Sequence, residues 1–151
     1  MRDFPFLGIR FQQICFGSPE YGLACELRDR ILRAPLGLTL SAQDLANEDQ
    51  ALHFGLFTAE DVLIACVVAA LLDPLTVKLR QMVVEPAHQG QGYGKALLEQ
   101  VEVVLQQRGV RRVVLHGRKT AIGFYQRLGY RVEGPEFVEV TVPHYRMEKL
   151  L

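Results

Sequence analysis

The sequence lacks several features that would assign the chain to a special class of protein. It contains no tryptophan and only three cysteines, Cys15, Cys25 and Cys66, with no CxxC pair and no metal-ligand spacing. An odd number of cysteines without such spacing favours free thiols in a reducing compartment over a disulfide framework or a zinc site. We therefore expect no metal site and a cytoplasmic location.

Long hydrophobic runs and an excess of one charge are also missing. The longest apolar stretch, VLIACVVAALL at residues 62–72, is shorter than the about 20 residues that a membrane-spanning helix needs. The first residues, MRDFPFLGIRFQQ, lack the apolar centre of a signal peptide. Equal numbers of basic and acidic side chains, 17 of each, give no overall attraction to nucleic acid or to an anionic membrane. We expect a soluble protein that binds neither.

The composition that is present is that of an ordinary globular protein. The 151 residues are 49% hydrophobic and 23% charged, and a chain of this length typically forms one domain with a substantial core. No internal repeat, linker or low-complexity segment divides the sequence. The chain is predicted to be a single domain over residues 1–151.

Apolar patterning predicts an α/β fold with one mixed sheet. The predicted strands are 8–16, 51–57, 61–72, 76–84, 110–116, 137–142 and 144–151, and the predicted helices are Ser18–Gly37, 42–47, 93–108 and 119–128. Short breaks between the strands at 51–57, 61–72 and 76–84 indicate antiparallel neighbours. Strand 76–84, helix 93–108 and strand 110–116 form a parallel crossover. We therefore expect about 6–7 strands and about 4 helices, with an antiparallel first half that becomes parallel at this crossover.

The stretch HQGQGYGK at residues 88–95 has the composition of a loop that holds an anion. It follows a buried strand and opens an amphipathic helix, whose first turn leaves backbone N–H groups unpaired. Those donors and the helix dipole favour phosphate, and Gly90, Gly92 and Gly94 allow close approach of the backbone to a ligand. The alternative is a glycine-rich turn without any ligand.

Two familiar nucleotide-binding loops do not fit this stretch. A P-loop needs GxxxxGK followed by Ser or Thr, but Ala96 follows Gly94-Lys95, and Gln89 stands where the first glycine should be. A dinucleotide fingerprint needs GxGxxG, and from Gly90 the sixth residue is Lys95. The sequence therefore argues against an NTPase and against NAD binding.

Two segments together resemble the GNAT superfamily of N-acetyltransferases. Gln89-x-x-Gly92-x-Gly94 before an amphipathic helix is similar to the acyl-coenzyme A loop of that family. AIGFYQRLGY at residues 121–130 is similar to its second motif, Ala-x-x-Phe-Tyr followed after three residues by Gly and an aromatic residue. The final PHYRM at residues 143–147 resembles a branch of small bacterial members, the ElaA-like and YjcF-like proteins.

The resemblance implies that acetyl-coenzyme A (acetyl-CoA) is the cofactor. The backbone from Gln89 to Lys95 would hold its pyrophosphate, and the end of strand 76–84 would pair with its pantetheine arm. Family members often have Asn where this chain has Arg118, so a contact from Arg118 to the cofactor phosphates replaces the usual amide. The implied cofactor-binding residues are Met82, Val83, Val84, Gln89, Gly90, Gln91, Gly92, Tyr93, Gly94, Lys95, Arg118 and Phe124.

The same resemblance implies transfer of an acetyl group to an amine, with Tyr125 as the general acid for the departing thiolate. The alternative for Tyr125 is a core tyrosine whose hydroxyl is satisfied elsewhere. Strand 76–84 offers Gln81 where the family often has a glutamate base. Among the histidines, His116 is placed best for that role, because carboxyl ends of parallel strands line sites at a topological switch. Weaker candidates for contact with the acceptor are Glu26, His53, Gln81 and His144.

The sequence leaves more than one function open. The main prediction is an acetyl-CoA-dependent N-acetyltransferase. The alternatives are a GNAT-like module that binds acyl-CoA without turnover, transfer of a longer acyl group, and transfer to a hydroxyl. The acceptor, a small-molecule amine or a protein or peptide amine, has no signature, and a homodimer is also open. Arg28, Arg30 and Arg33 on the first helix are predicted to form a solvated basic face.

Overall fold

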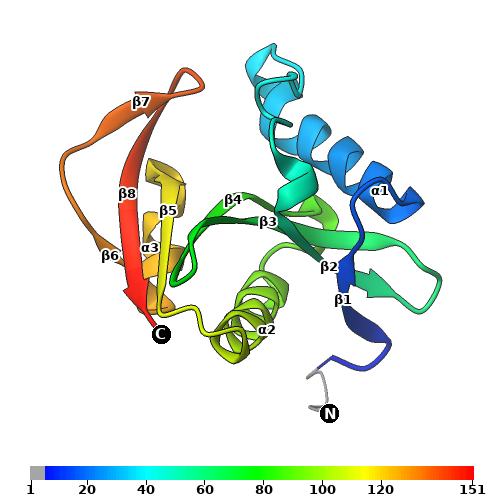
Figure 1. Cartoon of the computed structure of the whole chain (residues 1–151). Helices are drawn as coiled ribbons and strands as arrows, with labels where there is room; N and C mark the ends of the chain where they lie inside the picture. The colour runs from blue at the N-terminus through cyan, green and yellow to red at the C-terminus, as the bar shows by residue number, and fades with distance from the viewer. Residues whose placement is uncertain (1–5) are drawn as a thin grey trace.

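Eight strands form one mixed sheet in the computed structural model, which describes residues 6–151 (Figure 1). The strands are β1 Ile9–Ile14, β2 Leu52–Thr58, β3 Leu63–Asp73, β4 Thr76–Val84, β5 Arg112–Arg118, β6 Arg131–Val132, β7 Phe137–Glu139 and β8 Val142–Leu150. The α-helices of this part of the chain are α1 Pro19–Arg28, α2 Tyr93–Gln107 and α3 Ile122–Arg127. Residues 1–5, which belong to the segment inspected for a signal peptide, lie outside the described residues.

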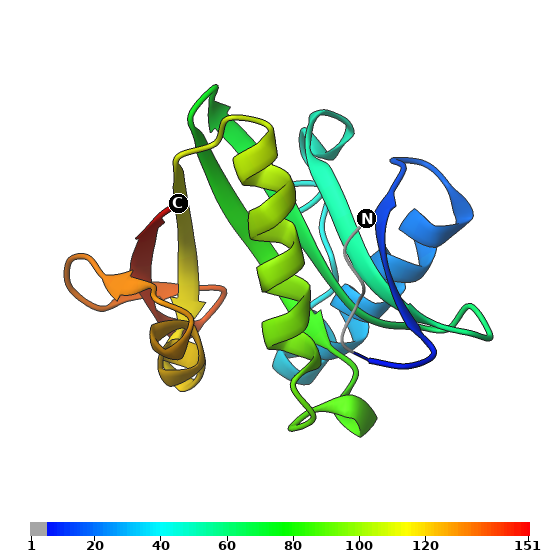
Figure 2. The ribbon, with the colours of Figure 1, turned by 90° about the horizontal axis from the view of Figure 1, so that it is seen from below.

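The order of strands in the sheet is β1-β2-β3-β4-β5-β8-β6, with β7 paired to β8. Strands β2 to β4 form the expected antiparallel meander, and β1 pairs antiparallel with β2 at its edge. α2 then carries the chain to β5, which lies parallel to β4. α1 lies on one face of the sheet, and α2 and α3 lie on the other (Figures 1 and 2). The predicted mixed α/β sheet is confirmed. Within residues 6–151, no helix combines the length and apolar character that a membrane crossing requires.

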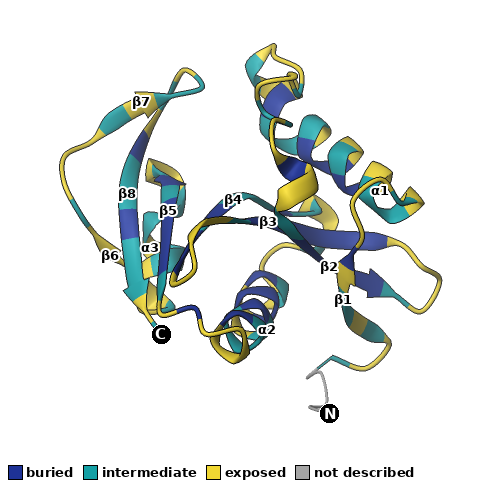
Figure 3. Cartoon of the chain, in the orientation of Figure 1, coloured by how far each residue is buried: buried dark blue, intermediate teal, exposed yellow. Residues whose placement is uncertain are grey.

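The main core lies between the sheet and α2. The apolar stripe predicted for residues 93–108 is buried there: α2, with Leu97, Leu98, Val101 and Leu105, packs against β2, β3 and β4. Figure 3 shows this helix face and the central strands as buried. Each fully buried leucine contributes roughly 1.5–3 kcal/mol. A second cluster, which includes Leu27, lies between α1 and the sheet.

The segment after α1 departs from the prediction. α1 begins as expected, with the Ser18 hydroxyl accepting a hydrogen bond from the Tyr21 N–H at 3.2 Å. The chain then continues through a π-helical turn, Asp29–Arg33, and a 3-10 turn that ends at Gly37 in the left-handed region. The predicted helix at 42–47 is wrong. Ser41 caps the chain there, but only successive turns follow, and Asn47 with φ 63° redirects the backbone.

The last two strands also differ from the prediction. They were expected to divide at Pro143, but the hairpin turn lies at Val140-Thr141, whose φ values are 45° and 68°. Pro143 is instead part of β8. It is tolerated because pairing with β5 ends at His144, so no N–H is needed on that side of Pro143. The short strand β6 was not predicted, since its two residues are too few to show a period.

A bulge in β4 separates it from β5. Parallel pairing covers only Thr76–Leu79 of β4, and the strands then diverge toward their carboxyl ends (Figure 2). Opposite β3, Arg80 pairs with Val68 and Val83 with Cys66, so two residues of β4 face one of β3, and Gln81 adopts φ 51°. Such an extra residue bends a strand and interrupts its ladder. The edge of β4 beyond Leu79 therefore faces an opening instead of β5.

A buried ion pair holds the bulge in place. Nε of Arg28 donates to Oε1 of Gln81 at 2.7 Å, and the two terminal nitrogens of Arg28 donate to the two carboxylate oxygens of Glu48. The Tyr21 hydroxyl donates to Glu48 at 2.6 Å. Arg28 is 0% and Glu48 1% exposed. Burial alone would raise the pKa of Glu48, but hydrogen bonds from Arg28 and Tyr21 bring this pKa below its usual value.

The expected solvated basic face on the first helix is therefore wrong. Arg28 is buried against Glu48, and Arg33 is almost buried against Asp44, with Nη2 2.9 Å from Oδ1. Arg30 is the exposed member of the three, paired with Glu85. Arg28 and Arg33 lie on the side of the helical segment that covers the sheet. A buried arginine needs a carboxylate partner to compensate its charge. Glu48 lies about 20 residues away along the chain.

We predict that Glu48→Gln lowers the free energy of unfolding by about 3 to 5 kcal/mol, because it leaves the buried Arg28 charge without a counterion. Urea denaturation followed by circular dichroism measures this change. Glu85→Gln is the matched control, since it breaks a similar arginine pair that is exposed and screened by water. Equal losses for the two variants would contradict the structural role given to the Arg28–Glu48 pair.

Candidate functional site

The glycine stretch forms one wall of a cavity of about 560 Å³, here called the loop cavity. The opposite walls come from the end of β4 and from α3. Of the predicted cofactor-binding residues, those that line it are Met82, Val83, Val84, Gln89, Gly90, Gly92, Tyr93, Gly94, Lys95 and Phe124. Ten of the twelve predicted positions are thus brought to one cavity, although they come from three elements.

Backbone donors at the start of α2 face this cavity. Gly92 precedes the helix in the left-handed region, with φ 87°, and no described side chain caps the first turn. The first backbone bond into the helix start is from Ala96 N–H to the Gly92 carbonyl, at 3.1 Å. The N–H groups of Tyr93, Gly94 and Lys95 precede it and have no partner within the helix. Together with the helix dipole, they favour an anion.

Gly94 is required for packing at the same place. A Cβ on Gly94 would lie 3.1 Å from Met82 Cε and 3.2 Å from Phe124 Cζ. Glycine therefore lets α2 approach β4 and α3 closely. Gly92 is needed for another reason, because its positive φ is costly for any residue with a Cβ.

Two predicted cofactor residues lie elsewhere, and Gln89 has a structural contact. Gln91 is exposed outside the loop cavity. Arg118 lines a different cavity and donates from Nη2 to the Leu32 carbonyl at 2.8 Å; burial lowers its pKa. The Gln89 side chain folds back to donate to the Val84 carbonyl at 3.0 Å. Gln89 therefore orders the loop against the end of β4.

Tyr125 lies where two cavities meet. It lines the loop cavity and also a second cavity of about 400 Å³, here called the central cleft, in the opening between β4 and β5. Its hydroxyl donates to Sδ of Met82 at 3.8 Å, and thioether sulfur is a weak acceptor. Burial raises the pKa of Tyr125 to about 12. The phenol therefore keeps its proton at neutral pH and can exchange its weak bond for a better acceptor.

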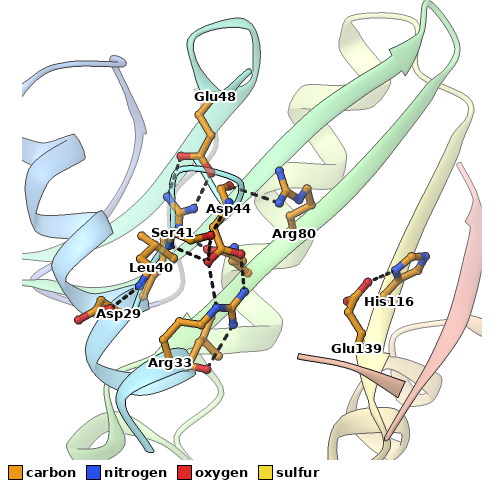
Figure 4. A network of polar contacts seen from close by, with 12 residues as sticks. Asp29, Arg33, Leu40, Ser41, Asp44, Glu48, Arg80, His116 and Glu139 are labelled. Atoms are coloured by element: carbon orange, nitrogen blue, oxygen red, sulfur yellow. Dashed lines mark hydrogen bonds and ion pairs between the residues drawn. The ribbon is translucent and has the colours of Figure 1, made fainter. Parts of the chain in front are cut away.

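His116 and Glu139 form a hydrogen-bonded pair in the central cleft (Figure 4). His116 Nδ1 is 2.9 Å from Glu139 Oε1. A carboxylate at Nδ1 places the imidazole proton on that nitrogen and leaves Nε2 as an acceptor. Burial opposes the charge on Glu139, but the hydrogen bond from His116 brings the pKa of Glu139 below its usual value. This arrangement orients a base whose free nitrogen is available.

The weaker candidates divide into two pairs. Gln81 and His144 line the central cleft; His144 Nδ1 is 2.8 Å from the Val142 carbonyl, and its Nε2 is 3.7 Å from Glu139. Glu26 and His53 lie outside the loop cavity and the central cleft. Glu26 is on the solvent side of α1, and His53 is buried in β2, where Nε2 is 2.7 Å from the Glu48 carbonyl.

Sequence reasoning did not identify Glu139 and Arg80, which line the central cleft, or Lys78, which lines the cavity next to it. Glu139 comes from β7, which reaches His116 only because β7 and β5 both pair with β8. Lys78 and Arg80 alternate with apolar residues in TVKLRQMVV, a pattern that marks one polar face of a strand but gives no function. Only the pairing of strands that are distant in the sequence shows that these side chains lie near His116.

Similarity to known proteins agrees with this geometry. Residues 23–130 match the Acetyltransferase (GNAT) family. The Bacillus subtilis (strain 168) protein YyaT is 35% identical over 74 residues, 49% of this chain and 50% of YyaT. The chain thus spans about half the length of the curated relatives it matches.

Solved structures share the fold over nearly the whole chain. Escherichia coli ElaA has a TM-score of 0.81 at 19% identity, covering 93% of this chain and 99% of ElaA. A GNAT family acetyltransferase from Elizabethkingia anophelis with acetyl-CoA bound has a TM-score of 0.72 at 18% identity, covering 97% and 100%. The family match includes the β4 bulge, the glycine loop and the Tyr125 segment. The chain belongs to the GNAT family of acetyltransferases.

Proposed function

We propose that this chain is an N-acetyltransferase that moves an acetyl group from acetyl-CoA to an amine by direct attack on the thioester. The observation that carries the proposal is the position of Tyr125, which lines both the loop cavity and the central cleft that contains His116. A donor and an acceptor entering from the two sides would meet beside this phenol. The central cleft would then receive the amine.

Residues of the loop cavity fit coenzyme A. The N–H groups of Tyr93, Gly94 and Lys95 suit a pyrophosphate, and the free edge of β4 beyond Leu79 suits a partner with peptide-like amides, as pantetheine has. The neighbour from Elizabethkingia anophelis, which carries acetyl-CoA, supports the same assignment. When bound, acetyl-CoA supplies the acetyl group as an activated thioester.

The side chains of the central cleft supply the proton transfers. His116 Nε2 accepts a proton from the amine, and Glu139 stabilises the imidazolium that results. The Tyr125 hydroxyl donates its proton to the departing sulfur. Backbone N–H groups at the Gln81–Met82 bulge, where the β4 ladder is interrupted, would stabilise developing negative charge on the carbonyl oxygen.

A module that binds acyl-CoA without turnover is the second candidate. Gln81 favours this binding module, because it stands on β4 where the family often has a glutamate and cannot itself serve as a base. The His116–Glu139 pair weakens that objection, because it supplies an oriented base from the neighbouring strand. We therefore favour turnover over binding alone.

Tyr125→Phe should lower kcat by about 10²-fold while leaving the affinity for coenzyme A nearly unchanged, because only the proton donor is removed. Steady-state release of thiol and calorimetric titration measure the two quantities. Tyr145→Phe is the control, since the Tyr145 hydroxyl bonds to Glu136 on the exposed hairpin. An unchanged kcat in Tyr125→Phe would exclude the general-acid role.

His116→Gln should lower kcat/KM by about 10²-fold at pH 7, where the amine must lose a proton to react. The deficit should shrink at pH values above the pKa of the amine itself, because the neutral amine then needs no base. A pH profile of kcat/KM for both proteins tests this. A deficit that stays constant across that range would indicate a structural role for His116.

Gly92→Glu should abolish measurable binding of coenzyme A, because it adds a carboxylate beside the anion-binding start of α2. Gly109→Glu is the matched control: it carries the same backbone penalty, with φ 89°, after the opposite end of α2. Isothermal titration calorimetry compares the two. Retained binding in Gly92→Glu would remove the glycine loop from the cofactor site.

A further inference from the structure

The central cleft continues into a third cavity of about 480 Å³, here called the distal cavity. The distal cavity lies on the side without Tyr125, and the residues that line both cavities are Arg33, Leu79, Arg80, Gln81, His116, Glu139 and Val140. Its other walls include Lys78 of β4 and the segment that contains Ser41 and Asp44. A molecule whose amine lies at His116 would therefore extend its remaining atoms toward Lys78 and Arg80.

Lys78, Arg80 and His116 lie on the same face of the sheet. Side chains alternate along a strand, so Lys78 and Arg80 share a face. Lys78 pairs with Val114 of β5, and His116 follows two residues later. Figure 4 shows Arg80 between the Ser41–Asp44 group and the His116–Glu139 pair. The base and the two cations are therefore parts of one continuous surface.

The carboxylates of the distal cavity are already engaged. Asp44 receives two hydrogen bonds from Arg33, at 2.9 and 3.2 Å, and others from the Ser41 N–H and hydroxyl. These bonds, with that from Arg33 the strongest, lower the pKa of Asp44 to about 2. Glu139 is bonded to His116.

The cations lack equivalent partners. Among residues 6–151, Lys78 has no ion pair, and Arg80 donates one long bond of 3.4 Å to the Asp44 backbone carbonyl. Both side chains are half-buried. Burial lowers the pKa of Lys78, the charge of Glu139 opposes this shift, and the charges of Arg80 and Arg146 add to it. Two neighbouring half-buried cations that form no ion pair with any described residue are the arrangement that an anionic ligand stabilises.

We propose that the acceptor is a small amine that also carries a carboxylate or phosphate, and that Lys78 and Arg80 bind this anionic group. The assignment rests on the proposed acetyl transfer, which places the amine at His116. Lys78 and Arg80 are then specificity-determining residues. Neutral amines lose the contact, and diamines place a second cation against two others, which is repulsive.

Matched acceptors test the proposal. Initial rates of thiol release from acetyl-CoA are compared for 4-aminobutyrate against butylamine and 1,4-diaminobutane, and for phosphoethanolamine against ethanolamine. We expect kcat/KM for at least one anionic amine to exceed that of its neutral partner by about tenfold or more, as a charge-assisted contact provides. The carboxylate and phosphate pairs show which anion is preferred. Equal rates within both pairs, or a preference for the diamine, would overturn the proposal.

Substitution of Lys78 and Arg80 tests whether these two residues cause the preference for anionic amines. In the double variant Lys78→Gln/Arg80→Gln, the ratio of kcat/KM between anionic and neutral amines should fall to near one. Arg111→Gln is the control and should keep the wild-type ratio, because Arg111 is exposed and lies just before the start of β5, away from His116. A preference that survives in the double variant would place the anion site elsewhere.

Binding distinguishes failure of this proposal from failure of acetyl transfer. The melting temperature of the protein with coenzyme A is measured with 4-aminobutyrate, phosphoethanolamine and their neutral partners, for the wild type and the double variant. A rise with an anionic amine that the double variant loses would support the anion site even if no amine were acetylated. No rise with any anionic amine, together with no acetylation, would overturn the site as well as the enzyme.

Discussion

The bulge at Gln81 and Met82 is the constraint on which the rest of the site depends. Without it, β4 would continue to pair with β5 beyond Leu79, and no opening would exist between them. The backbone of Gln81 has a positive φ, which is unfavourable for a residue with a side chain. The hydrogen bond from Arg28 to the Gln81 side chain, supported by the buried pairing of Arg28 with Glu48, offsets that cost. A charged pair under α1 thus keeps two strands apart.

Each functional group is placed by its relation to this opening. The glycine loop follows β4 directly, so its backbone donors lie at the end of the free edge. β5 carries His116 on the other side, and β8 brings the β7 hairpin with Glu139 against it. α3 closes the junction with Tyr125, for which Gly117 leaves room, since a Cβ there would lie 3.3 Å from the tyrosine ring. The groups proposed for acetyl transfer therefore meet because these strands, the loop and α3 all border the same opening.

Much of the fold was predictable because its signals are local. The apolar stripe of α2, the tight meander β2 to β4 and the strand–loop–helix order around Gly92 all show in short windows of sequence. The contacts that could not be predicted join residues that are far apart in the sequence. Arg28 was expected in solvent because Glu48 lies in an irregular segment, and Glu139 was missed because only the pairing of β8 brings it to His116. Likewise, the segment at 42–47 has a capping pattern but forms successive turns, in which Asp44 binds Arg33 as well as Ser41.

The direct test of the central claim follows the acetyl carbon itself. Acetyl-CoA labelled with ¹³C at the acetyl carbonyl is incubated with the protein and the amine panel, and the products are read by ¹³C NMR. Transfer in the opening between β4 and β5 predicts a new amide carbonyl resonance equal in amount to the thiol released. Labelled acetate alone, or unchanged thioester with every amine, would contradict the assignment of this chain as an N-acetyltransferase.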